Sequence, residues 1–291
     1  MAGRSRFLSV VMASAVLVAG LSGLSGSSAA AEPTGRDALV ADLDRILSDP
    51  RLIGAHPGVV VRDAATGETL YDRGGADRLL PASNNKLFTS VGALEALGPD
   101  YRFTTSALTI AAQQGTALNG DLYLRGTGDP TLLASDYDAL AAQVADAGIR
   151  VVTGRLIADD SWFDDVRLGV SWAWDDEPYY YSAQVSALTV APDTDYDAGT
   201  VIVRVAPGAA AGAPGLVQVV PATDYVRIDN RTTTGSTDTI SVERQHGSNT
   251  IVVSGTIPLG AAPTQDWASV WEPTGTPPTC SARPSRRTTC R

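Results

Sequence analysis

The pattern of hydrophobic and polar positions predicts a chain that starts with helices and later changes to strands. Residues 37–48 place leucine, isoleucine and valine at helical spacing, and an apolar segment at residues 83–97 follows Pro81 and stops at Gly98. Between these two predicted helices, residues 58–72 alternate around a turn and predict a β-hairpin.

After Tyr101 the pattern changes to short strands with a single helix at residues 136–147. This mixture predicts an α+β protein with a β-rich portion that follows the second helix. The predicted strands span residues 103–109, 121–125, 155–159, 200–205, 217–220, 226–228, 239–242 and 250–255.

Composition narrows the classes of function. The 291 residues are 44% hydrophobic, which is typical of a folded protein, and their net charge of −10 argues against binding to nucleic acid or to anionic lipid. The two cysteines, Cys280 and Cys290, lie in the last dozen residues, and the two histidines are His56 and His246. This supply of ligands is poor for a metal site, although one stays possible.

The first residues are typical of a targeting segment. Arg4 and Arg6 precede an apolar run at residues 7–21, and small side chains continue to Ala31. This order predicts a secretory signal peptide at residues 1–31 and an exported protein without a stable membrane anchor. The alternative is that the run itself is an anchor, but it is short and is interrupted by glycine and serine.

The strongest candidate chemistry lies at the start of the second predicted helix. Ser83 and Lys86 are three residues apart and so share one helical face, where a neutral lysine amine can take the proton of the serine hydroxyl. Lys86 is the only lysine in the chain, and arginine cannot supply such an amine. The alternative interpretation makes Ser83 a helix cap and Lys86 a solvated side chain.

The surroundings of this pair resemble a known family. Over residues 37–275 the chain resembles the D-alanyl-D-alanine carboxypeptidase/D-alanyl-D-alanine endopeptidase family, the low-molecular-mass class C penicillin-binding proteins. Several motifs in the same order carry the resemblance, at residues 80–103, 120–132, 154–163, 186–190 and 254–258.

The resemblance implies a partial penicillin-recognising domain of the β-lactamase/transpeptidase type, with a β-rich insertion between its first and second catalytic motifs. It implies that Ser83 is the acylated nucleophile and Lys86 its general base. The substrates would be the D-Ala-D-Ala stem peptides of peptidoglycan, β-lactams would be acylating inhibitors, and no cofactor would be needed. The implied parts are residues 32–104 with the S-x-x-K motif, residues 105–270 as an insertion of two lobes, and residues 271–291 as a return segment and basic tail.

The chain also departs from this family. The family uses S-x-N and K-T-G motifs after the insertion; the only S-x-N match here begins at Ser83 itself, and a chain whose single lysine is Lys86 has no K-T-G. From Thr276 the sequence turns into a basic, cysteine-containing tail, for which a shifted reading frame is the favoured explanation and a flexible basic tail the alternative. We therefore expect the chain to be inactive as written and its N-terminal portion to expose apolar surface.

Two other functions stay open: a non-catalytic module that binds the cell wall, and a different Ser–Lys acyl hydrolase of the esterase or β-lactamase type. Several further groups of side chains have structural explanations. The paired acids are expected to cap turns or lie in solvated loops, with a glycosidase-like carboxylate pair as the alternative. The aromatic side chains are expected to pack between lobes, with a glycan or peptide surface as the alternative. The three alternating aspartates suggest oxygen ligands for calcium but lack the EF-hand spacing, and the histidines, without obvious partners, are expected to be structural or exposed. These groups are Asp159, Asp160, Asp164 and Asp165; Asp193, Asp195 and Asp197; Trp172, Trp174 and residues 179–181; and His56 and His246.

Overall fold

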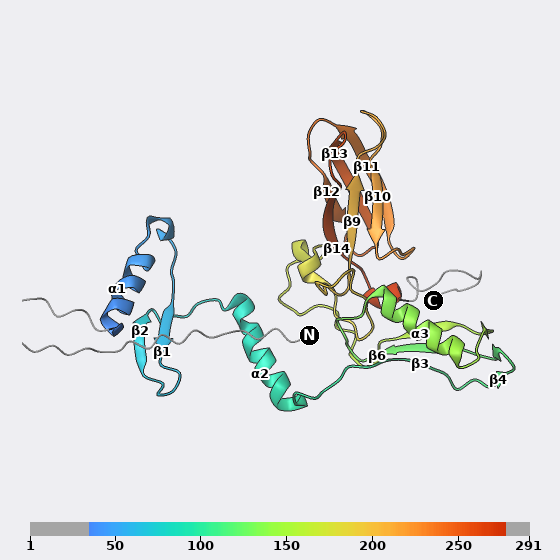
Figure 1. The fold of residues 1–291 in the computed structure, drawn as a ribbon, viewed down its shortest axis with the longest axis horizontal. Helices are drawn as coiled ribbons and strands as arrows, with labels where there is room; N and C mark the ends of the chain where they lie inside the picture. The colour runs from blue at the N-terminus through green and yellow to red at the C-terminus, as the bar shows by residue number, and fades with distance from the viewer. Residues whose placement is uncertain (1–34, 278–291) are drawn as a thin grey trace, which may run out of the picture. The chain divides into compact units, whose positions relative to one another are not determined.

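The computed structural model describes residues 35–277, and the chain divides between Ala96 and Leu97 into two compact units (Figure 1). We call their described parts the N-terminal unit, residues 35–96, and the C-terminal unit, residues 97–277. The predicted signal peptide at residues 1–31 and residues 278–291 of the tail lie outside the described residues. Within the described residues, no helix is long and apolar enough to cross a bilayer.

The N-terminal unit consists of two helices and a hairpin. The predicted hairpin is confirmed: its strands pair antiparallel, with Val60 opposite Asp72, and the Asp63 carboxylate accepts the backbone N–H of Thr66 in the turn. The elements in chain order are α1 (Gly35–Leu47), the 3-10 turn η1 (Pro50–Leu52), β1 (Val59–Arg62), β2 (Thr69–Arg73), the 3-10 turn η2 (Ala82–Asn84) and α2 (Asn85–Leu97).

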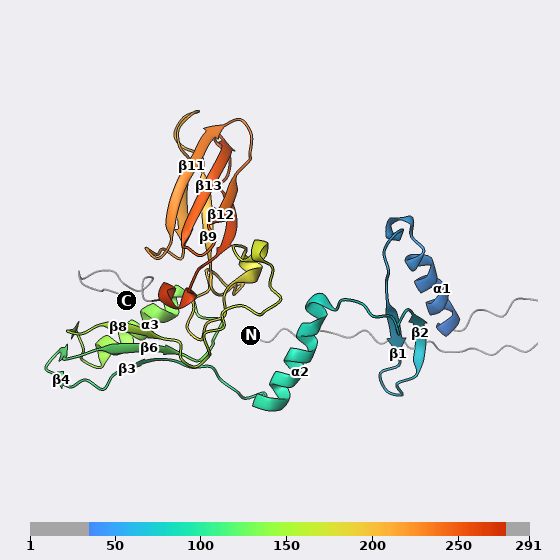
Figure 2. The ribbon, with the colours of Figure 1, turned by 180° about the vertical axis from the view of Figure 1, so that it is seen from behind.

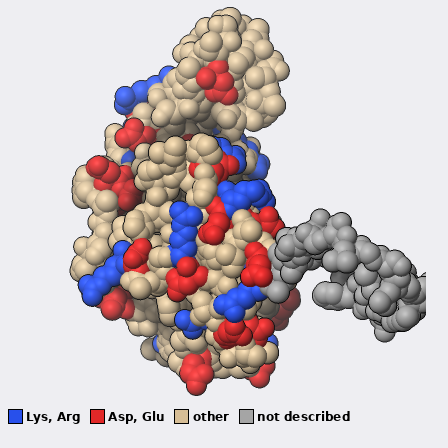
Figure 3. All heavy atoms as spheres, turned by 90° about the vertical axis from the view of Figure 1, so that its left-hand side faces the viewer, with Lys and Arg blue, Asp and Glu red and all other residues tan. Residues whose placement is uncertain are grey.

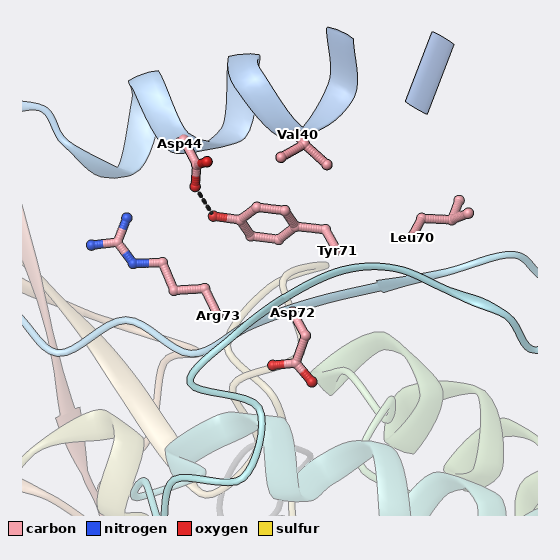
Figure 4. A pocket seen from close by; sticks show the side chains of 6 residues that line it. All are labelled: Val40, Asp44, Leu70, Tyr71, Asp72 and Arg73. Atoms are coloured by element: carbon pink, nitrogen blue, oxygen red, sulfur yellow. Dashed lines mark hydrogen bonds between the residues drawn. The ribbon is translucent and has the colours of Figure 1, made fainter. Parts of the chain in front are cut away.

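Helix α1 packs against the hairpin through a buried tyrosine. Tyr71 on β2 is 7% exposed, and its hydroxyl donates a hydrogen bond of 2.6 Å to Asp44 on α1 (Figure 4). This hydrogen bond is the main reason why the pKa of Tyr71 lies above its ordinary value, because a carboxylate acceptor favours the protonated phenol.

Helix α2 has large apolar side chains in solvent. Leu87, Phe88 and Val91 are 67%, 76% and 67% exposed. Burial of such side chains normally contributes about 1.5–3 kcal/mol each. The expectation that the N-terminal portion exposes apolar surface is therefore confirmed.

The C-terminal unit begins with a helix packed on a three-stranded sheet of order β3-β6-β8. The β3–β6 pair is antiparallel and the β6–β8 pair is parallel. Leu124 and Tyr137 form the core between sheet and helix, together with Leu188 and Val190 from a later loop. The elements are β3 (Thr105–Leu108), β6 (Leu122–Gly126), α3 (Ala134–Asp146) and β8 (Leu156–Asp159), and a small second sheet is formed by β4 (Gln113–Gln114), β5 (Ala117–Leu118) and β7 (Val151–Val152).

The rest of this unit is a pair of three-stranded sheets with one core between them (Figure 2). Valine and isoleucine alternate along the strands, so that Val201, Val203 and Val205 of one sheet meet Ile251 and Val253 of the other. The first sheet has the order β10-β9-β14 and consists of β9 (Thr200–Ala206), β10 (Leu216–Val220) and β14 (Thr264–Ser269); the second has the order β11-β13-β12 and consists of β11 (Arg227–Gly235), β12 (Ser241–Arg244) and β13 (Thr250–Pro258).

The predicted α+β class is confirmed, and each predicted helix and strand has a counterpart. Two boundaries were wrong: the α-helix predicted from Ser83 starts at Asn85, after η2, and the strand predicted at residues 226–228 extends to Gly235 as β11. Four strands were missed: the two-residue strands β4, β5 and β7, and β14, whose sequence, TQDWAS, is largely polar.

The segment that follows β14 contacts the first half of the C-terminal unit through a polar network. Asp160 accepts hydrogen bonds from Arg167 Nη2 (2.6 Å) and from Thr274 Oγ1 (2.5 Å), and Arg167 Nε donates to Glu272 (3.0 Å). Burial raises the pKa of Asp160, but the hydrogen bonds from Thr274 and Arg167 outweigh it, so that the net shift is downward. The network therefore stabilises the charged carboxylate.

Replacement of this carboxylate tests the network. We expect Asp160→Asn to lower the unfolding free energy at pH 7 by about 1–3 kcal/mol, the range for a hydrogen bond to a charged group. A lowered pKa stabilises the fold above the unfolded value near ~3.9, and this contribution is lost as the pH falls through the folded value. Urea unfolding of both proteins should therefore show a difference that shrinks between about pH 5 and pH 3.

The matched control is Asp164→Asn, since the exposed Asp164 carboxylate accepts only the backbone N–H of Val166 among the described hydrogen bonds. A loss for Asp160→Asn no larger than that of the control, or one that is independent of pH, would contradict the stabilising role of the network.

Candidate functional site

The candidate nucleophile Ser83 and its candidate base Lys86 lie at the start of α2. Ser83 is in the 3-10 turn η2, and Lys86 is in the first turn of the helix. The Lys86 ammonium Nζ donates a hydrogen bond of 3.0 Å to Ser83 Oγ. Their spacing of three residues therefore brings the two reactive atoms together without help from another element.

The turn before the helix fixes the direction of Ser83. Pro81 precedes the turn, and Ala82 has φ of +44°, in the left-handed region that an L-residue with a Cβ seldom adopts. Such a conformation costs on the order of 1–3 kcal/mol and occurs frequently at functional sites. This conformation could not be predicted from the sequence, because alanine is not one of the residues that favour this region.

The electrostatic environment of the pair is set by the helix. The backbone N–H groups of the first turn of α2 carry partial positive charge, which stabilises negative charge near Ser83. Within residues 35–277, Lys86 forms no ion pair with an acid, and α2 has no acidic side chain in its first turn. Ser90 Oγ donates to the carbonyl of Lys86 (2.8 Å) and so faces the same turn.

The pair is open to solvent. Ser83, Lys86 and their neighbours on η2 and α2 are exposed in the described residues. The hollow drawn in Figure 4, about 460 Å³, is a separate feature between α1 and β2, with neither Ser83 nor Lys86 in its lining. The Ser83–Lys86 pair is thus exposed and lies outside this hollow.

The other candidate residues do not gather into a catalytic or metal site. Within residues 35–277, no cluster of three or more His, Cys, Asp or Glu could hold a metal. Asp159 caps the turn at Ser161, and burial, followed by the charges of Asp193 and Asp195, raises the pKa of Asp197. On the face shown in Figure 3, the described Lys and Arg side chains alternate with Asp and Glu rather than form one patch.

One expectation about these residues was wrong, that the aromatic side chains pack between lobes, whereas both histidines are structural or exposed as expected. Both histidines have partners: His56 Nε2 lies 2.7 Å from Asp77, and His246 Nδ1 lies 2.9 Å from Glu177. The aromatic side chains expected to pack between lobes are largely exposed, with Trp174 at 69% and Tyr179 at 53%. The partners were not evident because they lie far from the histidines in sequence.

A comparison with protein families decides the assignment of the chain. Residues 39–276 match the model of the D-Ala-D-Ala carboxypeptidase 3 (S13) family. The chain belongs to the S13 family. Its S-x-x-K pair thus lies inside the stretch that defines the family, and the matched stretch ends at Thr276, where the tail begins.

Two relatives of this S13 chain are named D-alanyl-D-alanine carboxypeptidases. It is 51% identical over 238 residues to the D-alanyl-D-alanine carboxypeptidase of Actinomadura sp. (strain R39), which covers 80% of the chain and 44% of the relative. It is 30% identical over 158 residues to the D-alanyl-D-alanine carboxypeptidase DacB of Haemophilus influenzae, which covers 54% of the chain and 32% of the relative. The S13 chain thus spans less than half the length of these relatives.

Solved structures support the fold. The structure of penicillin binding protein 4 (dacB) from Haemophilus influenzae matches with a TM-score of 0.60 and 24% identity, over 74% of this chain and 47% of the other. The same protein complexed with a β-lactam matches with a TM-score of 0.55 and 21% identity, over 80% and 48%. The predicted penicillin-recognising α+β fold is therefore confirmed.

Proposed function

We propose that this S13 chain carries the acylating serine of a serine-type D-Ala-D-Ala carboxypeptidase/endopeptidase that acts on peptidoglycan stem peptides. The observation that carries the proposal is the 3.0 Å hydrogen bond between Lys86 Nζ and Ser83 Oγ, at the start of a helix in a member of this family. The signal-like segment at residues 1–31 supports export to the compartment where peptidoglycan lies.

The pair supplies the first half of an acyl transfer. Lys86 in its neutral form takes the proton of Ser83 Oγ as Oγ attacks the carbonyl carbon of the penultimate D-Ala. The tetrahedral oxyanion forms near the N-terminus of α2, and the peptide bond breaks as the terminal D-Ala leaves with a proton. Water then hydrolyses the ester on Ser83. A β-lactam follows the same first step, with its ring amide as the bond that breaks.

The exposed pair accounts for the expectation that the chain is inactive as written. An acyl-transfer site needs donors around the oxyanion and walls that hold the substrate, and the loss of one donor alone costs about 10²–10³-fold in rate. The part of the relatives beyond the matched stretch is the source we propose for these groups. A chimera that joins residues 32–276 of this chain to that part of the Actinomadura relative is therefore the protein to test.

The test of Lys86 is its replacement by arginine in this chimera. Arginine keeps the positive charge but does not deprotonate, so we expect Lys86→Arg to slow acylation by benzylpenicillin by about 10²–10⁴-fold, the usual contribution of a general base. Stopped-flow or gel-based labelling with a fluorescent penicillin measures the rate.

The control is the opposite substitution, arginine to lysine, at another exposed position. Arg102, whose guanidinium donates to the neighbouring Tyr101 carbonyl, is replaced by lysine and should leave the rate unchanged. An equal rate for Lys86→Arg and for the parent chimera would exclude Lys86 as the base while leaving the role of Ser83 open to its own test.

A further inference from the structure

A second cluster of titratable groups lies in the C-terminal unit, at the base of the paired sheets, where the 3-10 helix η3 (Trp174–Asp176) meets the end of β12. The indole ring of Trp174 stacks on the imidazole ring of His246, with ring centroids 4.3 Å apart and an interplanar angle of 12°. Figures 1 and 2 show this yellow segment beside the base of β12 and β14.

Glu177, the residue that follows η3, connects η3 to β12 through its buried side chain. Its side chain is 5% exposed, and Oε1 accepts a hydrogen bond from Arg244, whose side chain is fully buried. Within residues 35–277, the other oxygen, Oε2, is buried and has no partner with the geometry of a hydrogen bond. His246 Nδ1 lies 2.9 Å from it. A buried carboxylate oxygen without a donor is costly, and a positively charged imidazole is the group that compensates it best.

The charged residues of η3 and β12 determine how protonation of His246 changes the interaction between these two elements. η3 and its cap carry Asp175, Asp176 and Glu177, whereas β12 carries Glu243 and the buried Arg244. Arg244 donates hydrogen bonds to Glu177 Oε1 and to the backbone carbonyls of Gln245 and Ser248. A proton on His246 therefore adds positive charge opposite Oε2 and against the π face of Trp174, and both contacts favour it.

We propose that His246 is a proton-operated latch that holds the Trp174–Glu177 segment against β12. In the protonated form the imidazolium joins Glu177 Oε2 and Trp174, and the segment is held. When the proton leaves, the charge opposite Oε2 is lost and the segment loosens. The exposed aromatic side chains of Tyr179 and Tyr181 follow this segment in the sequence.

The experiment uses the full chain, with tryptophan fluorescence and amide hydrogen exchange measured from pH 5 to 8.5. Protonated imidazole quenches a stacked indole, so we expect the emission of Trp174 to rise as the pH is raised from 5 to 8.5. Amide exchange in residues 174–177, corrected for its intrinsic pH dependence, should be about two- to fivefold slower at pH 5.5 than at pH 8, the size expected of a partly exposed charge pair.

The chain has two histidines and five tryptophans, which makes the controls simple. His246→Gln and Trp174→Phe should each abolish the fluorescence transition, whereas His56→Gln should keep it. Circular dichroism establishes that each variant is folded. A transition that survives in His246→Gln, or a wild-type emission that stays flat over this range, would overturn the proposal. If His246→Gln does not fold, the Trp174→Phe and His56→Gln pair decides in the same way.

Discussion

Replacement of Arg244 by methionine is expected to destabilise the C-terminal unit by about 3–5 kcal/mol, because it leaves a buried carboxylate without its charge partner. Arg244 is the largest fully buried side chain among the described residues. It donates to Glu177 Oε1 and to the carbonyl of Glu177 (3.0 Å), and its Nε lies within hydrogen-bond distance of Ser269 Oγ (3.3 Å). Methionine has a similar length but satisfies none of these acceptors.

Urea unfolding followed by far-UV circular dichroism measures this effect, and two further variants interpret it. Arg227→Met changes an exposed arginine on β11 and should cost less than about 0.5 kcal/mol. Glu177→Gln combined with Arg244→Met removes both charges and should recover part of the loss. A double variant as unstable as the sum of the two single variants would contradict the argument from an unpaired buried charge.

Ser83→Ala is expected to abolish covalent labelling of the completed domain by penicillin, which is the largest effect on activity in this account. Removal of the nucleophile of an acyl-transfer enzyme typically costs about 10⁴–10⁶-fold in kcat, because no other group can form the acyl-enzyme. Ser83 is exposed and its Oγ accepts only from Lys86 among the described hydrogen bonds, so folding should be unaffected. Labelling with a fluorescent penicillin and parallel thermal unfolding separate the two effects.

The matched control lies on the same helix. Ser90 Oγ donates to the backbone carbonyl of Lys86, so Ser90→Ala removes a hydroxyl of equal size about two helical turns after Ser83. We expect this variant to label at the rate of the parent chimera. Equal loss in both variants would indicate that the helix, rather than the nucleophile, had been damaged.

Local pattern predicted much of the fold. Residues 37–48 and 83–97 have apolar side chains at helical spacing, and both helices form within two residues of the predicted bounds. The hairpin also follows from local chemistry, since Asp63 and Gly67 suit the turn that joins its strands. The proximity of Ser83 to Lys86 is local in the same sense, because three residues of helix place the two side chains on one face.

Contacts over long sequence distances could not be predicted in this way. Arg244 and Glu177 are 67 residues apart, and Asp160 and Thr274 are 114 apart. The first pair meets where the end of β12 contacts the residue after η3, and the second where the chain after β14 returns to the segment after β8. Strand β14 itself lacks the apolar alternation of a strand and depends on pairing with β9. The left-handed Ala82 was also beyond prediction, since the surrounding fold and not the residue imposes it.

The central claim, that Ser83 is the acylated nucleophile, is tested most directly by mass spectrometry of the chimera after incubation with benzylpenicillin. Intact mass shows whether one benzylpenicilloyl group is added, and fragmentation of the peptide that contains residues 79–102 shows which side chain carries it. The account predicts a single adduct on Ser83, which is absent from Ser83→Ala and present in Ser90→Ala. A folded chimera without an adduct, or an adduct that persists in Ser83→Ala, would contradict it.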